Sequence, residues 1–263
     1  MIDYDQIYSE IMARLTDLIQ WCDRTLQTHQ FKDYCPNGLQ IEGKSEVNRI
    51  VSSTTASLHA IEAALDQKAD ALLVHHGYFW KGEPAPLTGI KGKRIKQLMQ
   101  ADISLIAYHL PLDAHTTLGN NKALADLLGI EITGALDLQE KFPIGNVGEL
   151  KQAITAHEFA QMIAEKLGQA PLHISSGKQL VKKVGFCTGG AQDFLYKAAA
   201  LDCDAYISGE VSERTYHEAL EYGVDYYAAG HHATERYGIQ RLAEALAKEF
   251  DLQHHYIELN NPV

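Results

Sequence analysis

An internal repeat constrains the fold of this chain more than any other feature of its sequence. Short apolar runs alternate with helix-like segments in both halves, and matching positions such as Arg49 and Lys183 are related by an offset of 134 (183 − 49). A second offset of 121 places residues 103–107 on residues 224–228. Apolar runs that alternate with helical patterns indicate β-α-β units with parallel strands. We therefore predict a duplicated β-α-β-α-β-α unit, with chance similarity between two ordinary β-α-β units as the alternative.

The two halves give similar sets of predicted elements. In the first half, strands are expected at residues 49–56, 71–74 and 103–108, and helices at residues 4–27, 57–67, 92–100 and 121–128. In the second half, strands are expected at residues 184–190, 205–210, 226–229 and 254–258, and helices at residues 193–201 and from about residue 232 onward. Strand runs are short and apolar, and helices follow the 3.6-residue period.

The predicted fold class is α/β, with two interlocked lobes built from the duplicated unit and mostly parallel strands. Residues 1–130 form the first half, and residues 183–263 form the second half, packed with the first around the metal site. Between them, residues 131–182 do not fit the repeat and are predicted to be a β-α-β insert. We expect this insert to be a lid, a dimer surface or a cover for the metal cleft. A chain of 263 residues is long enough to bury such a core.

Histidines and carboxylates follow three of the predicted strands. His75 and His76 come after an apolar run and before a glycine, and Asp113 lies in a predicted loop beyond the next strand. His231 and Glu235 follow a third strand and are four residues apart, so both can lie on one face of the first turn of a helix. A histidine pair can converge only where a strand ends, because neighbouring side chains inside a strand point to opposite faces.

Five potential ligands of this kind favour a metal centre. Imidazole nitrogens and carboxylate oxygens without thiolates suit Zn, Mn, Fe, Co or Ni better than Ca. Five ligands, one of them a carboxylate that can bridge, exceed the needs of one tetrahedral ion. The sequence therefore predicts two divalent ions roughly 3.5–4 Å apart, an arrangement that activates a hydroxide. The alternative is that some of these histidines are helix caps or core residues.

Further residues are candidates for proton transfer or substrate contact. Glu210 ends a predicted strand and corresponds to His76 under the first offset of 134 (210 − 76). We therefore expect Glu210 to support a metal ligand or to contact the substrate. His115 and His232 are titratable groups next to predicted ligands. Together with Glu235, these three residues make up the predicted catalytic set.

Composition argues against several other classes of protein, although it does not exclude local binding of nucleic acid. A net charge of −11 disfavours broad binding to nucleic acid or anionic membranes. Apolar runs are too short to span a bilayer, and residues 1–5 lack the features of a secretory signal, so the cytoplasm is the expected location. The four cysteines show no CxxC spacing, so we expect reduced thiols rather than disulfides or a thiolate zinc site.

Four stretches together resemble one known family. They are residues 36–40 (PNGLQ), 75–82 (HHGYFWKG), 109–115 (HLPLDAH) and 230–236 (GHHATER). Their combination is similar to the NGG-interacting-factor-like family, widely labelled GTP cyclohydrolase I type 2 homologues, and most similar to its bacterial YbgI-type branch. The resemblance spans nearly the whole chain.

The resemblance implies a two-lobed α/β subunit that assembles into a toroidal homohexamer with a dinuclear metal site inside the ring. The family's metal ligands fall on His75, His76, Asp113, His231 and Glu235, and in that pattern Glu235 bridges the two ions.

Two functions are compatible with these observations. The first is a dinuclear metal-dependent hydrolase of a small molecule, for which a GTP cyclohydrolase activity would open the purine ring at C8 and release formate. Residues 78–80 could stack on a base and Lys81 could meet a phosphate, but core or interface packing is an equal alternative for these aromatic residues. No P-loop is present to support a nucleotide. The second function is a non-enzymatic metal carrier or a metal-responsive scaffold protein.

Overall fold

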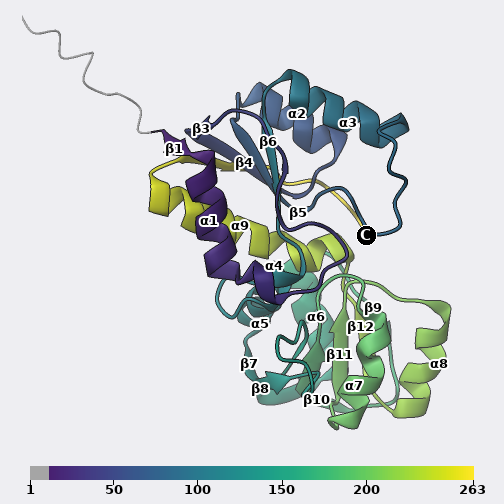
Figure 1. Ribbon diagram of the computed structural model, residues 1–263. Helices are drawn as coiled ribbons and strands as arrows, with labels where there is room; N and C mark the ends of the chain where they lie inside the picture. The colour runs from purple at the N-terminus through teal and green to yellow at the C-terminus, as the bar shows by residue number, and fades with distance from the viewer. Residues whose placement is uncertain (1–11) are drawn as a thin grey trace, which may run out of the picture. The chain divides into compact units, whose positions relative to one another are not determined.

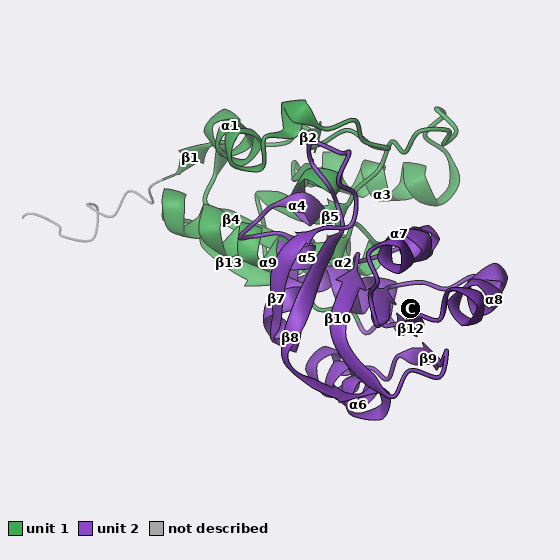
Figure 2. Cartoon of the chain, turned by 90° about the horizontal axis from the view of Figure 1, so that it is seen from below, with its two compact units in different colours: residues 1–111, 239–259 green, residues 112–238, 260–263 purple. Residues whose placement is uncertain are grey.

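The structure is a computed structural model that describes residues 12–263, and its contacts divide the chain into two compact units (Figure 1, Figure 2). Unit 1 comprises Met1–Pro111 and Ile239–Leu259, and unit 2 comprises Leu112–Gly238 and Asn260–Val263. The boundaries between the units fall inside α4 (Leu110–Ala114), inside α9 (His231–Phe250) and after Leu259. The predicted division into residues 1–130, 131–182 and 183–263 stays a prediction. Each unit is built on its own sheet.

Unit 1 contains a five-stranded, mostly parallel sheet. Its strands, in spatial order, are β13 (Gln253–Tyr256), β4 (Arg49–Thr55), β5 (Ala71–His76), β6 (Ser104–Ala107) and β2 (Gly38–Ile41). The first four strands are parallel, and only β2 runs antiparallel, against β6. The strands β1 (Ala13–Arg14) and β3 (Glu46–Val47) form a separate antiparallel pair. This parallel sheet places the carboxyl ends of β4, β5 and β6 at one edge.

Two helices cover one face of this sheet. Both α2 (Leu58–Asp66) and α3 (Gly89–Gln100) pack their buried residues, such as Ile61 and Leu98, against Leu72 and other residues of the central strands. The remaining helices of unit 1 are α1 (Leu15–Leu26), η2 (Thr28–Gln30) and the C-terminal part of α9. Helices α1 and α9 lie side by side, with the rings of Trp21 and Phe250 6.5 Å apart (Figure 1).

Unit 2 contains a six-stranded mixed sheet with helices on both faces. Its strands, in spatial order, are β7 (Ile130–Ala135), β8 (Asn146–Thr155), β10 (Leu180–Phe186), β11 (Ala205–Ser208), β12 (Asp225–Ala228) and β9 (Leu172–Ile174). The parallel strands are β10, β11 and β12, and the outer strands are antiparallel.

The helices that lie wholly within unit 2 are α5 (Asn120–Leu128), α6 (Ala156–Leu167), η3 (Gln192–Phe194), α7 (Leu195–Ala200) and α8 (Glu213–Tyr222). Unit 2 also contains residues 112–114 of α4 and the first turns of α9, residues 231–238. Neighbouring residues of one strand belong to opposite cores: Ile207 packs with α5 and α6, whereas Tyr206 packs with α7 and α8. This alternation is the period-2 geometry of a strand buried on both faces.

Strand registers confirm the predicted duplication. Ile50 pairs with Ala71 in unit 1, and the equivalent residues under the first offset, Val184 and Ala205 (184 − 50 and 205 − 71), pair with each other in unit 2. The predicted α/β class and the parallel strands at the centre of both units are likewise confirmed. The duplicated element is therefore a three-stranded parallel sheet with its connecting helices.

The structure also adds a strand to the repeat. Gly38 of β2 pairs with Ala107, and Leu172 of β9 pairs with Ala228, each in an antiparallel register. These pairs are related by the same two offsets as the rest of the repeat, 134 (172 − 38) and 121 (228 − 107). Strand β9, predicted as part of the insert, thus occupies the position in unit 2 that β2 occupies in unit 1.

Two predicted elements differ from the structure. The helix predicted over residues 4–27 begins only at Leu15, because residues 13–14 are extended and pair with β3, and residues 4–11 lie outside the described part of the chain. Asp113 was predicted in a loop but lies in the short helix α4, because a proline such as Pro111 is compatible with the first turn of a helix. In residues 12–263, no helix combines the length and the apolar character that crossing a bilayer requires.

Candidate metal-binding sites

In unit 1, His75 and His76 form a close imidazole pair at the end of β5. Their ring centroids lie 4.5 Å apart. His75 Nδ1 donates to the Tyr108 carbonyl oxygen at 2.8 Å, and His76 Nδ1 lies 3.2 Å from Thr55 Oγ1. Both hydrogen bonds use Nδ1, so Nε2 is the ring nitrogen that would face a metal ion. The predicted convergence of the pair at the strand end is confirmed.

A third imidazole, which is not among the ligands predicted from the sequence, lies beside this pair. His109 follows β6, and its ring centroid lies 5.2 Å from that of His75 and 5.8 Å from that of His76. Ligand atoms of these three histidines all lie within 4.8 Å of one another, so the group could hold a metal ion. The sequence signal was its position, because His109 follows an apolar strand in the same way as the histidine pair.

Asp33 orients the ring of His109. The carboxylate oxygen Oδ1 of Asp33 lies 2.7 Å from His109 Nδ1, and the Asp33 side chain is only 4% exposed. Burial alone would raise the pKa of Asp33, but hydrogen bonds from His109, Asn37 and the Tyr34 amide outweigh it and lower the pKa below its usual value. The carboxylate therefore remains charged and fixes the tautomer in which His109 Nδ1 carries the proton.

The loop after the histidine pair begins with a glycine, Gly77, that no larger residue can replace without a shift. Three aromatic residues, 78–80, follow it. A Cβ on Gly77 would overlap with Gln40 Oε1 and lie 2.8 Å from Ala107 Cβ, so a larger residue would displace the loop. Tyr78 is buried and donates to the Ala56 carbonyl oxygen, and this burial raises its pKa to about 12. Tyr78 is therefore a core residue.

The next two aromatic residues have different environments. The ammonium group of Lys91 lies 5.1 Å from the centre of the Phe79 ring and covers it. Trp80 is half-buried, and its ring lies 5.0 Å from His109 and 6.1 Å from His76, between centroids. Of the three aromatic residues predicted to stack on a base, Trp80 is the one beside the histidines. The Lys81 side chain is exposed.

In unit 2, Asp113, His231 and Glu235 form a second group. His231 and Glu235 lie one turn apart at the start of α9, with His231 Nε2 2.9 Å from Glu235 Oε2, as their four-residue spacing predicted. Asp113 and Glu235 are both buried and have carboxylate oxygens within 4.8 Å of each other. Glu210, which follows β11, places Oε1 2.7 Å from His231 Nδ1. The structure thus brings these four predicted residues together.

Neighbouring residues hold the carboxylates of this group in place. Asn120 Nδ2 donates to Asp113 Oδ1 at 2.8 Å, and Thr188 Oγ1 lies 3.5 Å from the same oxygen. Gly189 has a φ of +66°, and a Cβ there would overlap with Glu235 Oε1. Only glycine therefore permits the turn after β10 to approach the glutamate so closely.

The electrostatics of the unit 2 group favour a cation. Burial alone would lower the pKa of His231, but the Glu235 and Glu210 carboxylates outweigh this effect and raise it to about 9. Burial, reinforced by Asp113 and Glu235, raises the pKa of Cys187 well above its usual value. Cys187 therefore remains a neutral thiol, and the donors of this group are oxygen and imidazole nitrogen, as predicted.

Two predicted catalytic histidines occupy other positions in unit 2. His115 Nδ1 accepts a hydrogen bond from the Leu118 amide at 3.0 Å, so this ring caps a turn. His232 is 4% exposed, and its backbone amide donates to the Val263 carbonyl oxygen. Neither histidine belongs to a potential metal-binding group among residues 12–263.

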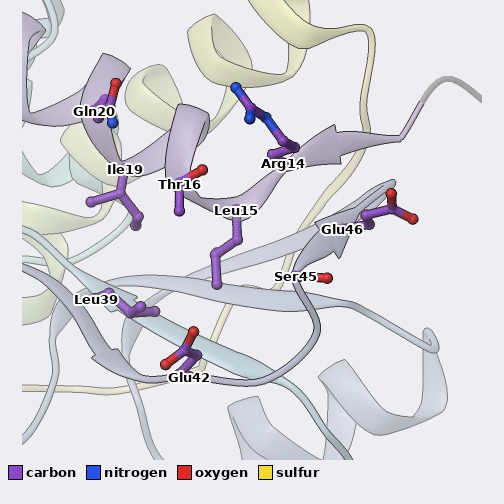
Figure 3. Close-up of a pocket in the computed structure, with 9 residues that line it drawn as sticks. All are labelled: Arg14, Leu15, Thr16, Ile19, Gln20, Leu39, Glu42, Ser45 and Glu46. Carbon is purple, nitrogen blue, oxygen red and sulfur yellow. The ribbon is translucent and has the colours of Figure 1, made fainter.

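Unit 1 also contains a pocket that is separate from the histidines. The pocket has a volume of about 500 Å³. Figure 3 shows Leu15 and Ile19 of α1 on one side and Leu39 of β2 on the other, and the lining also includes Arg14, Glu42 and Glu46. Its lining includes none of the predicted metal ligands. Its apolar lining comes from Leu15, Ile19 and Leu39, and no histidine or cysteine is among its described lining residues.

Comparisons with known proteins agree on one family. A family model described as Duf34/NIF3 (NGG1p interacting factor 3) matches residues 13–262. A Vibrio cholerae protein named GTP cyclohydrolase 1 type 2 homolog is 51% identical over 243 residues, which cover 92% of this chain and 96% of that protein. An Escherichia coli K12 protein with the same name is 46% identical over 248 residues, which cover 94% of this chain and 98% of that protein.

Solved structures show the same fold. A structure described as protein ybgI of unknown function superposes with a TM-score of 0.92 at 46% identity, covering 95% of this chain and 100% of that chain. Reduced HcgD from Methanocaldococcus jannaschii superposes with a TM-score of 0.82 at 25% identity, covering 95% of this chain and 99% of that chain.

Proposed function

This chain belongs to the Duf34/NIF3 family, and we propose that it is a dinuclear metal-dependent hydrolase of a small molecule. Two divalent ions would be held by His75 and His76 of unit 1 together with Asp113, His231 and Glu235 of unit 2, with Glu235 shared by both ions. The family resemblance supports this ligand set. One observation carries the proposal: His75, His76 and His231 each use Nδ1 for a hydrogen bond to an oxygen atom, which directs Nε2 toward a metal.

The donor chemistry fits a borderline divalent ion. The unit 1 pair offers imidazole nitrogens, and the unit 2 group adds two buried carboxylates that carry the compensating negative charge. Zn, Mn, Fe, Co and Ni accept such mixed nitrogen and oxygen ligands. When bound, ions of this class would supply Lewis-acid activation of a substrate and of water.

The residues of the chain itself would position the reactants. Glu210 holds the His231 ring through a 2.7 Å contact, and Asn120 holds Asp113 through a 2.8 Å hydrogen bond. Because these partners are already in place, little reorganisation is needed when charge develops in a transition state. Glu210 is also a carboxylate that touches a predicted ligand without belonging to the ligand set, so we propose it as the residue that accepts or returns a proton.

We propose that the substrate carries a flat heteroaromatic ring, as a purine nucleotide does. Trp80 supports this proposal because its ring lies beside His76 and His109 and its Nε1 donates to the Gly77 carbonyl oxygen, which fixes its orientation. Such a ring can stack on a planar base. The names of the curated relatives, GTP cyclohydrolase 1 type 2 homolog, point to the same substrate class.

A substrate-panel assay on metal-loaded protein tests this function. The panel should contain GTP and other purine nucleotides and nucleosides, with release of formate and loss of the purine absorbance as readouts. We expect turnover by the wild type, and at least a roughly 100-fold loss in Glu235→Ala because a shared ligand is removed. Glu244→Ala, an exposed glutamate on the same helix, is the matched control and should retain wild-type turnover.

The same assay can overturn the proposal. Absence of turnover across the whole panel, by protein that contains its full complement of metal, would contradict the hydrolase function. If such protein also releases its ions reversibly to an acceptor, the metal-carrier function becomes the better account.

A further inference from the structure

Unit 1 contains a third potential metal ligand, His109, in addition to His75 and His76. His75 and His76 end β5, and His109 follows β6, the strand that pairs in parallel with β5. The three rings are mutual neighbours, with centroids 4.5 to 5.8 Å apart. Because parallel strands end at the same edge of a sheet, this cluster follows from the topology of unit 1 alone.

Asp33 and Asn37 fix both the ring and the backbone of His109. Asp33 Oδ1 accepts from His109 Nδ1, and Asn37 Oδ1 accepts from the His109 amide at 2.8 Å. Asp33 Oδ2 in turn accepts from Asn37 Nδ2 and from the Leu110 amide at 2.9 Å. With Nδ1 committed in this way, Nε2 is the nitrogen of His109 that presents a lone pair to its surroundings.

Asp33 is a support for His109 and not itself a ligand. Its two oxygens together accept from His109, Asn37 and the amides of Tyr34 and Leu110. Cys35 also has its sulfur near the Asp33 and His109 ligand atoms, so these three residues superficially suggest a second cation site. Coordination there would break several hydrogen bonds of a buried carboxylate, and hydrogen bonds to a charged group are among the stronger ones in a protein.

The arrangement around His109 matches that of the other proposed ligands. His75 pairs Nδ1 with the Tyr108 carbonyl oxygen, and His231 pairs Nδ1 with the Glu210 carboxylate. A histidine that binds metal through one nitrogen usually donates its other N–H to a carboxylate or carbonyl oxygen. His109 with Asp33 is such a pair, in contact with two other imidazoles.

We infer that His109 is an additional metal ligand, which completes a three-imidazole site for a divalent ion such as Zn²⁺ or Co²⁺ within unit 1, and that Asp33 is its positioning residue. This inference rests on the proposed metal centre and adds a sixth protein donor to it. The donor atoms lie within 4.8 Å of one another, and around a tetrahedral ion with Zn–N bonds of roughly 2.0–2.1 Å they would be about 3.3 Å apart.

Cobalt binding to the full-length metal-free protein tests the inference. Co²⁺ would be titrated in competition with a chromophoric chelator, and the visible d–d spectrum would be recorded at each step. We expect His109→Gln, which retains a hydrogen-bond donor for Asp33, to bind one Co²⁺ at least tenfold more weakly and with an altered spectrum. Asp33→Asn should weaken the same ion by about tenfold, because it removes the carboxylate that orients the ring.

His59→Ala is the matched control, because His59 is an exposed histidine on α2 of the same unit. It should bind Co²⁺ like the wild type. Far-ultraviolet circular dichroism and thermal unfolding of the metal-free proteins would verify that each variant is folded, and His109→Ala provides a second substitution if His109→Gln is not.

Folded His109 variants with the affinity or the spectrum of the wild type would overturn the inference. This outcome is distinguishable from failure of the proposed hydrolase function. Wild-type protein that binds Co²⁺ but turns over no substrate contradicts the hydrolase function and leaves the His109 result intact. Conversely, the wild type could turn over substrate while the His109 variants keep the Co²⁺ spectrum of the wild type. That result would contradict the assignment of His109 as a ligand and leave the hydrolase function intact.

Discussion

At the residue scale, the histidines of the two potential metal-binding groups share one arrangement. In each of them, Nδ1 forms a hydrogen bond with an oxygen atom. For His231 this partner is Glu210, and for His109 it is Asp33. The sequence predicted His231 and Glu210 because both lie at the ends of apolar strands. It did not predict the pairing of Asp33 with His109, since 76 residues separate them and no periodic pattern connects a loop carboxylate to a distant strand end.

Glu210→Gln tests the supporting role of Glu210. The amide retains the size of the side chain but removes the charge that favours metal binding through His231. We expect metal affinity to fall about 10- to 100-fold, with the helical content of the protein unchanged. Equilibrium titration with Zn²⁺ measures the change. Glu221→Gln, an exposed residue on α8, should bind like the wild type, and equal affinities for the two variants would contradict the prediction.

At the element scale, the strands of the repeat were predictable, whereas the β1–β3 pair and the helix α4 were not. Strands such as β5 and β11 are continuous apolar runs, and a parallel strand buried on both faces has this composition. The extended pair of β1 with β3 involves only two residues of each strand, and α4 contains a proline that resembles a loop signal. The equivalence of β9 with β2 was missed because a strand of three residues carries too little pattern.

Both units contain an aspartate at the equivalent position of the repeat, just before the second parallel strand. In each unit its carboxylate accepts hydrogen bonds from backbone amides at the start of the first parallel strand. Asp70 Oδ2 accepts from the amides of Asn48 and Arg49, and Asp204 Oδ2 accepts from those of Lys182 and Lys183. Each aspartate therefore joins one strand of the repeat to the next, and this role accounts for its appearance at both positions.

Asp70→Asn should destabilise the protein at neutral pH. Burial alone would raise the pKa of Asp70, but hydrogen bonds from Lys44, Asn48 and Arg49 outweigh it and lower the pKa below 3.8. A lowered pKa in the folded state stabilises the protein above pH 3.8 and loses this contribution as the pH falls through the folded-state pKa. The Asp70 side chain is partly exposed, at 15%, so solvent screens its interactions. We therefore expect the free energy of unfolding to fall by only about 1 kcal/mol at pH 7.

Urea unfolding of the metal-free variants measures this effect. The difference between Asp70→Asn and the wild type should shrink at acidic pH, below about pH 4, where the wild-type carboxyl becomes protonated. The exposed Asp66→Asn on α2 is the control and should change stability little at any pH. A pH-independent loss in Asp70→Asn would contradict the electrostatic explanation.

At the scale of the whole molecule, each unit has its own sheet, core and group of potential ligands. The sequence predicted the duplication because both units follow the same order of strands and helices. The meeting of His75 and His76 with Asp113, His231 and Glu235 around shared ions stays a prediction. It depends on how two separately built units assemble, which local sequence patterns do not encode.

We also propose, from the family resemblance, that six subunits form a toroidal homohexamer. Light scattering coupled to size-exclusion chromatography should then give a mass six times the 29.2 kDa of one chain. Measurement at several concentrations distinguishes a stable ring from a reversible association, because subunit assembly depends on protomer concentration. The mass of a single chain or of a dimer, at micromolar concentration, would contradict the hexamer.

Anomalous diffraction from crystals of zinc-loaded protein, recorded on both sides of the zinc absorption edge, tests the proposed metal centre most directly. Two anomalous peaks per chain should appear, bonded to His75, His76, Asp113, His231 and Glu235, with Glu235 contacting both. A single peak, or peaks bonded to other side chains in place of these five, would contradict the dinuclear centre on which the proposed function depends.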